Sequence, residues 1–370
     1  MRQPHLMFDN RIGEKLRLVW GLRAEYVNLN KVNQVLDTAF ANINKGKPEK
    51  DQYDYSDLLN REPNLNLFPS ANLTYSLTPK MNFRLAYAKS IVRPDLRELS
   101  YFREYDFELG GAYTAGLIRS TLIHNLDFRY EWYPNPGEII SISLFYKKLD
   151  YPMEIYKVGD NREYELRNNK SAKNRGIEVE LRKSLAFTGL PVIKHLTLYG
   201  NFTALDARVT PMLLSYNQRN PDNPLKITPI ENIGEEEKRP QTGASNFMYN
   251  AGAYYDDGPF SLSMSYNYVT NRMFRPNIQY AFSLFERPLE SLDGQLAFRL
   301  LKKRAEVKLN VSNLLGSSSV VYINRYDDPE INNFKKAPNT QQLLYQKDKD
   351  VVDFETKPGR TFSLSFSYQF

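Results

Sequence analysis

The 370-residue sequence contains no cysteine, which excludes disulfide bridges, thiolate metal sites and thiol nucleophiles. It has no run of 18 or more apolar residues, so it cannot form a transmembrane helix. Its first residues lack the apolar region of about 7–15 residues that a secretory signal peptide requires. Its three histidines, His5, His124 and His195, are far apart in the sequence and do not predict a metal site.

Sequence motifs for catalysis and nucleic-acid binding are also missing. No serine lies in a Gly-x-Ser-x-Gly turn, and no glycine-rich phosphate loop is present. The formal net charge of +6 is small for this length, and the cations form no compact patch with stacking aromatics. The charged run 235–239 (EEEKR) and the acids Asp327, Asp328 and Glu330 are interpreted as solvated loop charge, with cation or polar-ligand binding as the alternative. We therefore predict a protein that is not an enzyme, has no cofactor and binds no nucleic acid.

Aromatic residues and alternating patterns are abundant. The chain has 26 Tyr and 21 Phe, which favour strands and membrane interfaces. Residues 360–370 read RTFSLSFSYQF, so apolar and polar side chains fall on opposite faces of a strand. This segment is about as long as a tilted strand needs to cross a bilayer, roughly 9–11 residues. A mean hydropathy of −0.56 fits such strands, because half of their side chains are polar.

The alternation recurs in about 12 or 13 segments, none of which has the helical period near 3.6. The connections between these segments alternate between short turns and long polar loops. The short turns are 10–14, 78–80, 134–137, 256–259 and 302–304, and the long loops are 30–63, 92–119, 209–243, 273–288 and 317–357. Short turns at one rim and long loops at the other are typical of an outer-membrane barrel. We therefore predict an all-β fold, an antiparallel transmembrane β-barrel, in one domain over residues 1–370.

Two groups of side chains fit this fold. Aromatic residues near strand ends suit an anchoring girdle at the membrane interfaces: Tyr26, Trp132, Tyr133, Tyr268 and Tyr368. Charged residues on the face opposite the apolar one predict ion-pair ladders across neighbouring strands: Arg84, Arg129, Glu131, Glu178, Glu180 and Arg182.

Several segments, in a fixed order along the chain, carry a family pattern. They are 93–102 (RPDLRELSYF) with Tyr105-Asp106, 124–134 (HNLDFRYEWYP), 143–154 (SLFYKKLDYPME), 175–180 (RGIEVE), 311–315 (VSNLL), Pro358-Gly359 and the terminal Phe370. Together they resemble TonB-dependent outer-membrane receptors of the Bacteroidetes type. One departure concerns segment 111–117, GAYTAGL, where the family usually has Asn-Pro and a Leu after the glycine. We expect that extracellular loop to differ in shape.

The resemblance implies ligand-gated import of a scarce nutrient across the outer membrane of a Gram-negative cell, powered through the TonB complex. Iron chelates, cobalamin, glycans and peptides all remain open as substrates. The family has an N-terminal coupling box, a plug domain and a barrel of 22 strands. We therefore interpret the chain as the C-terminal portion of such a barrel, with the plug absent. The implied partners are outer-membrane lipid, the missing N-terminal plug and barrel half, the TonB complex reached through that part, the barrel-assembly machinery and a possible surface lipoprotein.

The resemblance also implies roles for individual residues. It places Arg93, Arg97, Glu98 and Tyr101 in an extracellular loop that folds over or into the lumen. There they form a wall of the substrate site or contact the plug, and salt bridges that merely anchor the loop are the alternative. The last strand resembles the signal that the assembly machinery reads, carried by Phe366, Tyr368 and Phe370.

Two rival functions remain open. One is a plugless outer-membrane pore or surface-binding barrel without coupled transport. The other is a soluble secreted β protein, such as a glycan-binding sandwich. A partial barrel also has two open edges, and each unpaired backbone group costs several kcal/mol in lipid. We expect an isolated part of this kind to aggregate, close as a smaller barrel or require its missing half.

Overall fold

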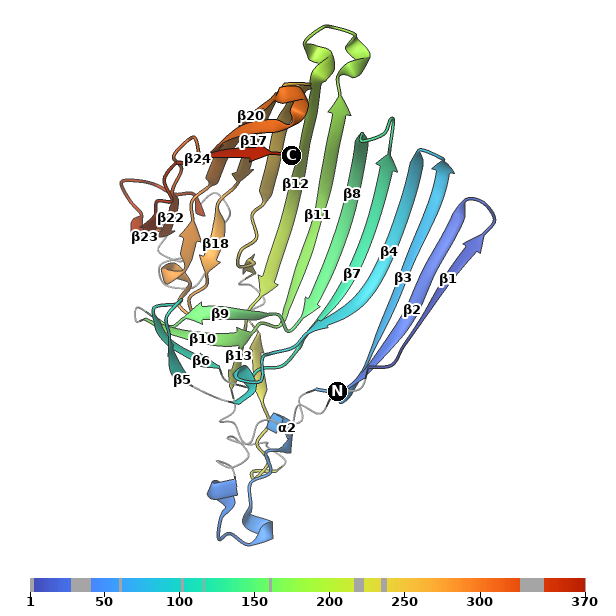
Figure 1. Ribbon diagram of the computed structural model, residues 1–370. Helices are drawn as coiled ribbons and strands as arrows, with labels where there is room; N and C mark the ends of the chain where they lie inside the picture. The colour runs from blue at the N-terminus through green and yellow to red at the C-terminus, as the bar shows by residue number, and fades with distance from the viewer. Residues whose placement is uncertain are drawn as a thin grey trace.

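The computed structural model describes residues 3–27, 41–59, 62–100, 103–115, 117–159, 162–215, 223–233, 238–326 and 343–369. They form one sheet of 14 strands and three small sheets (Figure 1). Thirteen strands of the large sheet form one path: β1 (His5–Ile12), β2 (Leu16–Tyr26), β3 (Leu65–Thr78), β4 (Met81–Val92), β7 (Thr121–Trp132), β8 (Ile139–Asp150), β11 (Ser171–Ser184), β12 (Leu196–Thr210), β16 (Phe247–Asp257), β17 (Phe260–Val269), β20 (Leu289–Leu300), β21 (Ala305–Ser312) and β24 (Thr361–Tyr368). The fourteenth, β15 (Arg239–Pro240), pairs with β12.

Neighbours on this path are antiparallel and follow one another in the chain order of the large sheet. Their connections alternate between short and long, as predicted, so the sheet has a short-turn rim and a long-loop rim. Figure 1 shows the hairpin turns of β1–β2, β3–β4 and β7–β8 together at the upper rim. Two connections were not predicted: a long loop at 151–170, and an eleven-residue turn at 185–195 on the short-turn rim.

The register gives the large sheet one apolar and one polar face. A row of directly paired residues crosses β4, β7, β8, β11 and β12: Leu85, Phe128, Leu144, Ile177 and Ala204. The adjacent row on the other face consists of Arg84, Arg129, Ser143, Glu178 and Thr203. Moving one residue along each strand thus changes the side chains from apolar to polar, as the side-chain period of two requires. The predicted alternation is confirmed.

The two ends of the path are open. Among the described residues, β1 pairs only with β2, and β24 pairs only with β21. The sheet is therefore an antiparallel β structure that curves without closing into a barrel. Its thirteen path strands agree with the predicted 12 or 13. No helix within the described ranges is long and apolar enough to cross a membrane.

The long loops contain small sheets that the sequence pattern does not predict. The first lobe is the sheet of β5 (Arg103–Asp106), β6 (Gly111–Ala115), β10 (Glu163–Asn168) and β9 (Met153–Lys157). The second lobe is the sheet of β18 (Arg272–Arg275), β19 (Leu284–Glu286), β22 (Ser319–Ile323) and β23 (Val351–Thr356). A further hairpin joins β13 (Met212–Ser215) and β14 (Ile230–Ile233). Short helices are η1 (Glu49–Asp51), α2 (Ser56–Leu59), η2 (Glu98–Ser100), η3 (Ala186–Thr188), η4 (Ile193–His195), η6 (Tyr280–Phe282) and η7 (Leu301–Lys303).

Each lobe has its own apolar core. Buried side chains of the first lobe are Tyr113, Ala115, Tyr164 and Leu166. Those of the second lobe are Met273, Phe285, Tyr322 and Leu343. The lobes also touch each other, because Lys157 of β9 forms a β-bridge with Asn277 beyond β18. The Asn277 amide donates to the Gly159 carbonyl at 2.7 Å.

Candidate functional site

An ion-pair ladder runs across the polar face of the large sheet. Glu131 of β7 accepts from Arg84 Nε of β4 and from Arg129 Nε, each at 2.9 Å. Arg129 Nη2 reaches on to Glu180 Oε2 of β11, also at 2.9 Å. Glu131 is buried, with 7% of its side chain exposed. The predicted ladder is thus confirmed for these four of its six residues.

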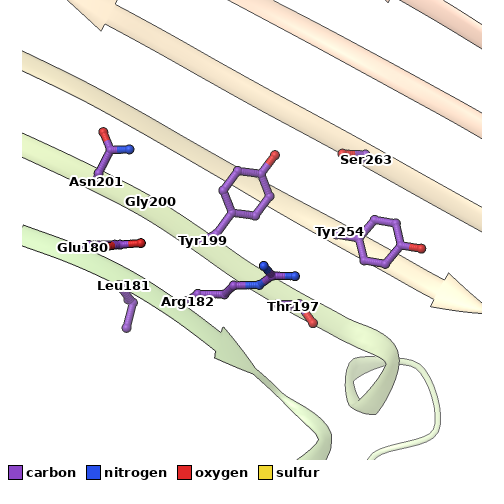
Figure 2. Close-up of a pocket in the computed structure, with 9 residues that line it drawn as sticks. All are labelled: Glu180, Leu181, Arg182, Thr197, Tyr199, Gly200, Asn201, Tyr254 and Ser263. Atoms are coloured by element: carbon purple, nitrogen blue, oxygen red, sulfur yellow. The ribbon is translucent and has the colours of Figure 1, made fainter. Parts of the chain in front are cut away.

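Beside this ladder lies a pocket of about 450 Å³ between β11, β12, β16 and β17 (Figure 2). Arg182, Tyr199 and Tyr254 come from three neighbouring strands and line it, with Glu180 of the ladder at its edge. Leu181 points the other way in Figure 2, as the alternation along β11 demands. A cation, two phenols and a carboxylate give the pocket donors, acceptors and aromatic faces for a polar ligand or protein segment.

Gly252 of β16 shapes this pocket. It pairs with Tyr199, whose ring lies over the glycine and whose hydroxyl donates to the Met264 carbonyl at 3.4 Å. A Cβ at position 252 would lie 2.3 Å from the Tyr199 ring. The glycine is therefore required so that the aromatic ring can lie flat on the sheet. This pocket was not predicted, because the sequence shows only that alternate residues of β11 and β12 are polar and not which strands lie beside them.

The loop residues expected to face a ligand are held by ion pairs. Arg93 Nη2 lies 2.5 Å from Glu25 Oε2 at the end of β2, and only 4% of the Glu25 side chain is exposed. Arg97 pairs with Glu104 of β5 at 2.5 Å, but both of these side chains are about half exposed. The Arg93 pair is therefore the buried one of the two.

Glu98 also links its loop to the first lobe. Its carboxylate accepts from the Asp95 amide at 2.9 Å and from the Tyr113 hydroxyl at 3.1 Å. Tyr101, the fourth residue, lies outside the described residues. These contacts are the anchoring ones that the sequence analysis weighed as an alternative, and a direct ligand role for the loop stays a prediction.

A buried polar cluster joins the lobes to the large sheet. Arg239 of β15 is 2% exposed and donates to Glu154 of β9 and, at 2.7 Å, to the Tyr156 hydroxyl. The Asn169 amide donates to Glu154 at 2.8 Å, and the Thr242 backbone amide donates to the same carboxylate at 2.9 Å. Three chain segments therefore meet at one carboxylate. The interpretation of Arg239 as solvated loop charge is therefore wrong, because nothing local in the run 235–239 marks this residue as buried.

The electrostatics of this cluster favour the charged pair. Burial raises the pKa of the Glu154 carboxyl, but the charge and hydrogen bond of Arg239, together with the Thr242 amide, lower it further, so the pKa lies below its usual range. Burial lowers the pKa of Arg239, and the neighbouring Glu154 outweighs this effect and raises it above its ordinary value. Both side chains are consequently ionised at neutral pH.

Within the described ranges, no group of three or more His, Asp and Glu is arranged to hold a metal ion. The acidic segments 235–237 and 327–330 lie outside the described residues. The polar face, its pocket and the two anchored lobes are thus the surfaces available to a ligand or partner.

A family model described as TonB dependent receptor-like, beta-barrel matches residues 6–314. This match covers more than half of the chain. The chain belongs to the TonB-dependent receptor β-barrel family. Whether it is of the Bacteroidetes type stays a prediction. None of the curated proteins matches the chain.

Solved receptors of low sequence identity share the fold. The ferric enterobactin receptor PfeA of Pseudomonas aeruginosa, as a mutant in complex with enterobactin, is 12% identical with a TM-score of 0.55 and is matched over 100% of this chain and 45% of its own. The ferric yersiniabactin uptake receptor FyuA of Yersinia pestis is 11% identical with a TM-score of 0.56, and the match covers 100% of this chain and 45% of FyuA. The siderophore receptor PiuA of Acinetobacter baumannii is 12% identical with a TM-score of 0.57, and the match covers 99% of this chain and 42% of PiuA. The chain therefore spans less than half the length of these receptors.

The predicted girdle residues lie at both rims of the receptor sheet. Tyr26 ends β2 and Tyr268 lies near the end of β17, both at the long-loop rim. Trp132, Tyr133 and Tyr368 lie at the short-turn rim. Their anchoring role stays a prediction.

The predicted assembly signal lies on the last strand. Phe366 and Tyr368 are exposed on β24, where they share the apolar face with Val307 and Ala305 of β21. Phe370 lies outside the described residues, and the signalling role stays a prediction.

Proposed function

We propose that this chain forms the C-terminal part of the barrel of an outer-membrane receptor that imports a scarce nutrient when its ligand binds. In this proposal the apolar face contacts the lipid of a Gram-negative outer membrane, and the polar face lines the lumen. The chain is a transport component and not an enzyme. Its energy comes from the inner membrane through TonB.

The observation that carries the proposal is the large sheet itself. Thirteen strands keep one register, with an unbroken apolar face on one side and the Arg84–Glu180 ladder on the other. Such a sheet needs lipid on one face and a polar lumen on the other. Its two open edges need partner strands, because unpaired backbone groups are costly in a bilayer. Strands and a plug supplied by another part of the receptor would meet both needs.

The lobes support a role in ligand capture. They lie at the long-loop rim, which is the extracellular rim in outer-membrane barrels. Arg93 ties the loop that follows β4 to β2, while Arg239 ties the first lobe to β12. The loops are thereby pre-organised, which lowers the entropy lost when a ligand binds. We propose Arg93, Arg97, Glu98 and Tyr101 as part of the wall of this capture site.

The test is nutrient-limited growth of a strain that lacks the gene. An iron chelate, cobalamin, a glycan or a peptide is supplied in turn as the limiting nutrient, and the full gene is returned on a plasmid. The expected result is that one nutrient class requires the gene, and that the rescue disappears when the TonB complex is removed.

A plugless pore gives the opposite result. Rescue that persists without the TonB complex, together with ligand-independent ion conductance of the purified protein in planar bilayers, would refute coupled import. Recovery of the protein in a detergent-free soluble fraction would refute the membrane location itself.

A further inference from the structure

The turn between β11 and β12 differs from the other turns at the short-turn rim. It comprises residues 185–195 and is called the apolar turn here. Phe187, Leu190, Val192 and Ile193 are exposed by 73%, 51%, 66% and 39%. Each of the other short turns, at 13–15, 79–80, 133–138, 258–259 and 301–304, exposes at most one large apolar side chain. Four such side chains on one turn need a specific environment.

The backbone of the apolar turn is internally hydrogen-bonded. The Leu185 amide donates to the Leu196 carbonyl at 2.8 Å, and the Thr188 hydroxyl donates to the Leu185 carbonyl at the same distance. The Lys194 amide donates to the Leu190 carbonyl at 3.0 Å. These bonds give the turn a defined shape with the short helices η3 and η4. Internal pairing of backbone groups is also what a low-polarity environment requires.

The turn folds back toward the apolar face of the sheet. Lys183 pairs with Leu198 and alternates with Leu181 on β11, so it lies on that face. The Lys183 ammonium lies 5.3 Å from the centroid of the Phe187 ring. It also pairs with Glu138 at 2.8 Å, which fixes its position. Phe187 therefore lies on the side of the sheet that faces lipid.

The apolar stretch of β11 is short. On this face it runs from Ile177 to Leu181 and is bounded by the charges of Arg175 and Lys183. At about 3.3 Å per residue and a tilt of about 40°, the distance from Arg175 to Lys183 along the membrane normal is roughly 20 Å, less than the usual apolar band of about 25 Å. Lys183 thus marks the level of the lipid head groups, and the apolar turn begins there.

We propose that the apolar turn is an interfacial membrane anchor. Phe187, Leu190 and Val192 enter the boundary between head groups and acyl chains of the periplasmic phospholipid leaflet. Lys183 and Lys194 lie at the level of the lipid phosphates. This depth, about 5–10 Å, is that of an interfacial amphipathic segment. The apolar turn is continuous with the apolar face of the sheet, which favours lipid as its partner, and this inference rests on the membrane location proposed above.

The 370 residues contain no cysteine, so one substitution adds the only thiol in this part of the protein, and any cysteine elsewhere in the receptor is first replaced by serine. Single-cysteine variants Phe187→Cys and Val192→Cys carry an environment-sensitive NBD fluorophore. The full protein, purified from outer membranes, is reconstituted into phosphatidylcholine vesicles that contain a lipid with a nitroxide near its head group. Glu14→Cys, in the exposed turn after β1, is the water control at the same rim. Leu144→Cys, on the apolar face of β8, is the lipid control.

The expected result is blue-shifted emission at positions 187 and 192, with nitroxide quenching about threefold or more above that at position 14. Quenching at position 144 but not at 187 or 192 would overturn the anchor while leaving the membrane location intact. Shielding of 187 and 192 from both nitroxide and aqueous iodide would overturn it in favour of a protein contact. Failure of position 144 to be quenched would overturn both proposals.

Discussion

The large sheet and the two lobes are stabilised in different ways. The largest fully buried side chains, Arg239, Tyr322, Phe285 and Met273, belong to the lobes or to their junction with β12. The thirteen strands of the large sheet instead leave many large apolar side chains exposed on one face, as Leu144 is at 50%. The large sheet is held together by backbone hydrogen bonds between its strands and has no protein core of its own, whereas each lobe folds around an apolar core.

The difference follows from what each region contacts. In a receptor sheet, lipid replaces the protein core on one face and the lumen contents replace it on the other. In the proposed membrane setting the lobes lie in water beyond the rim, so they must bury their own apolar surface to become ordered. Loops without cores would lose far more conformational entropy than their hydrogen bonds recover. The comparison therefore predicts that mutations act locally, in one region at a time.

The largest effect is expected at the junction. Arg239→Met leaves the Glu154 charge buried without its partner and should cost about 3–5 kcal/mol. Hydrogen exchange followed by mass spectrometry should show lost protection in 153–168 and unchanged protection in β4 and β7. The double variant Arg239→Met/Glu154→Leu removes both charges and should recover much of the loss. Equal loosening of the large sheet would contradict the separation of the two regions.

Acid should act on the same junction. The folded-state pKa of Glu154 lies below its ordinary value of about 4.5, so the carboxylate contributes stability that is fully present above that value. This contribution is lost as the pH falls through the depressed pKa. Pepsin should therefore cut the first lobe faster as the pH falls below the ordinary carboxyl range. Arg239→Met/Glu154→Leu should lack this dependence relative to the wild type, and an identical acid response in both would exclude Glu154 as its origin.

The large sheet could be predicted from sequence because its signal is local. Alternate residues of one strand face the same side of the sheet. Segments such as 177–181 therefore predict both the strand and its two faces, even when the neighbouring strands are unknown. Ladder residues could be named for the same reason, since Arg129 and Glu131 share a phase on one strand.

The lobes could not be predicted, because their contacts are not local. Glu154 and Arg239 are 85 residues apart, and the sequence around neither one predicts a buried ion pair. β6 pairs in parallel with β10, which lies about fifty positions further along the chain. Only the fold brings such segments together. The pocket beside Tyr199 was missed similarly, since it needs side chains from four strands.

A smaller effect is expected within the large sheet. Gly252→Ala places a Cβ 2.3 Å from the Tyr199 ring and should destabilise the sheet by about 1–3 kcal/mol. Gly294→Ala is the matched control, since the nearest atom to its Cβ is 3.8 Å away. Urea unfolding of the detergent-folded protein measures both. Tyr199→Ala should relieve the clash in the double variant, and a double variant as unstable as the single would show that the ring is not the cause.

The smallest effect is expected at the exposed pair of the first lobe. Arg97→Ala breaks an ion pair whose side chains are 56% and 41% exposed, so the lobe should lose less than about 1 kcal/mol. Hydrogen exchange in 103–115 measures this loss, and Glu104→Ala is the control that breaks the same pair from its other side. Because anchoring by Arg97 is weak, the pair of variants separates its two roles. If Arg97→Ala impairs nutrient-limited growth and Glu104→Ala does not, Arg97 contacts the ligand. Equal impairment would mean that the ion pair matters only as an anchor of the loop.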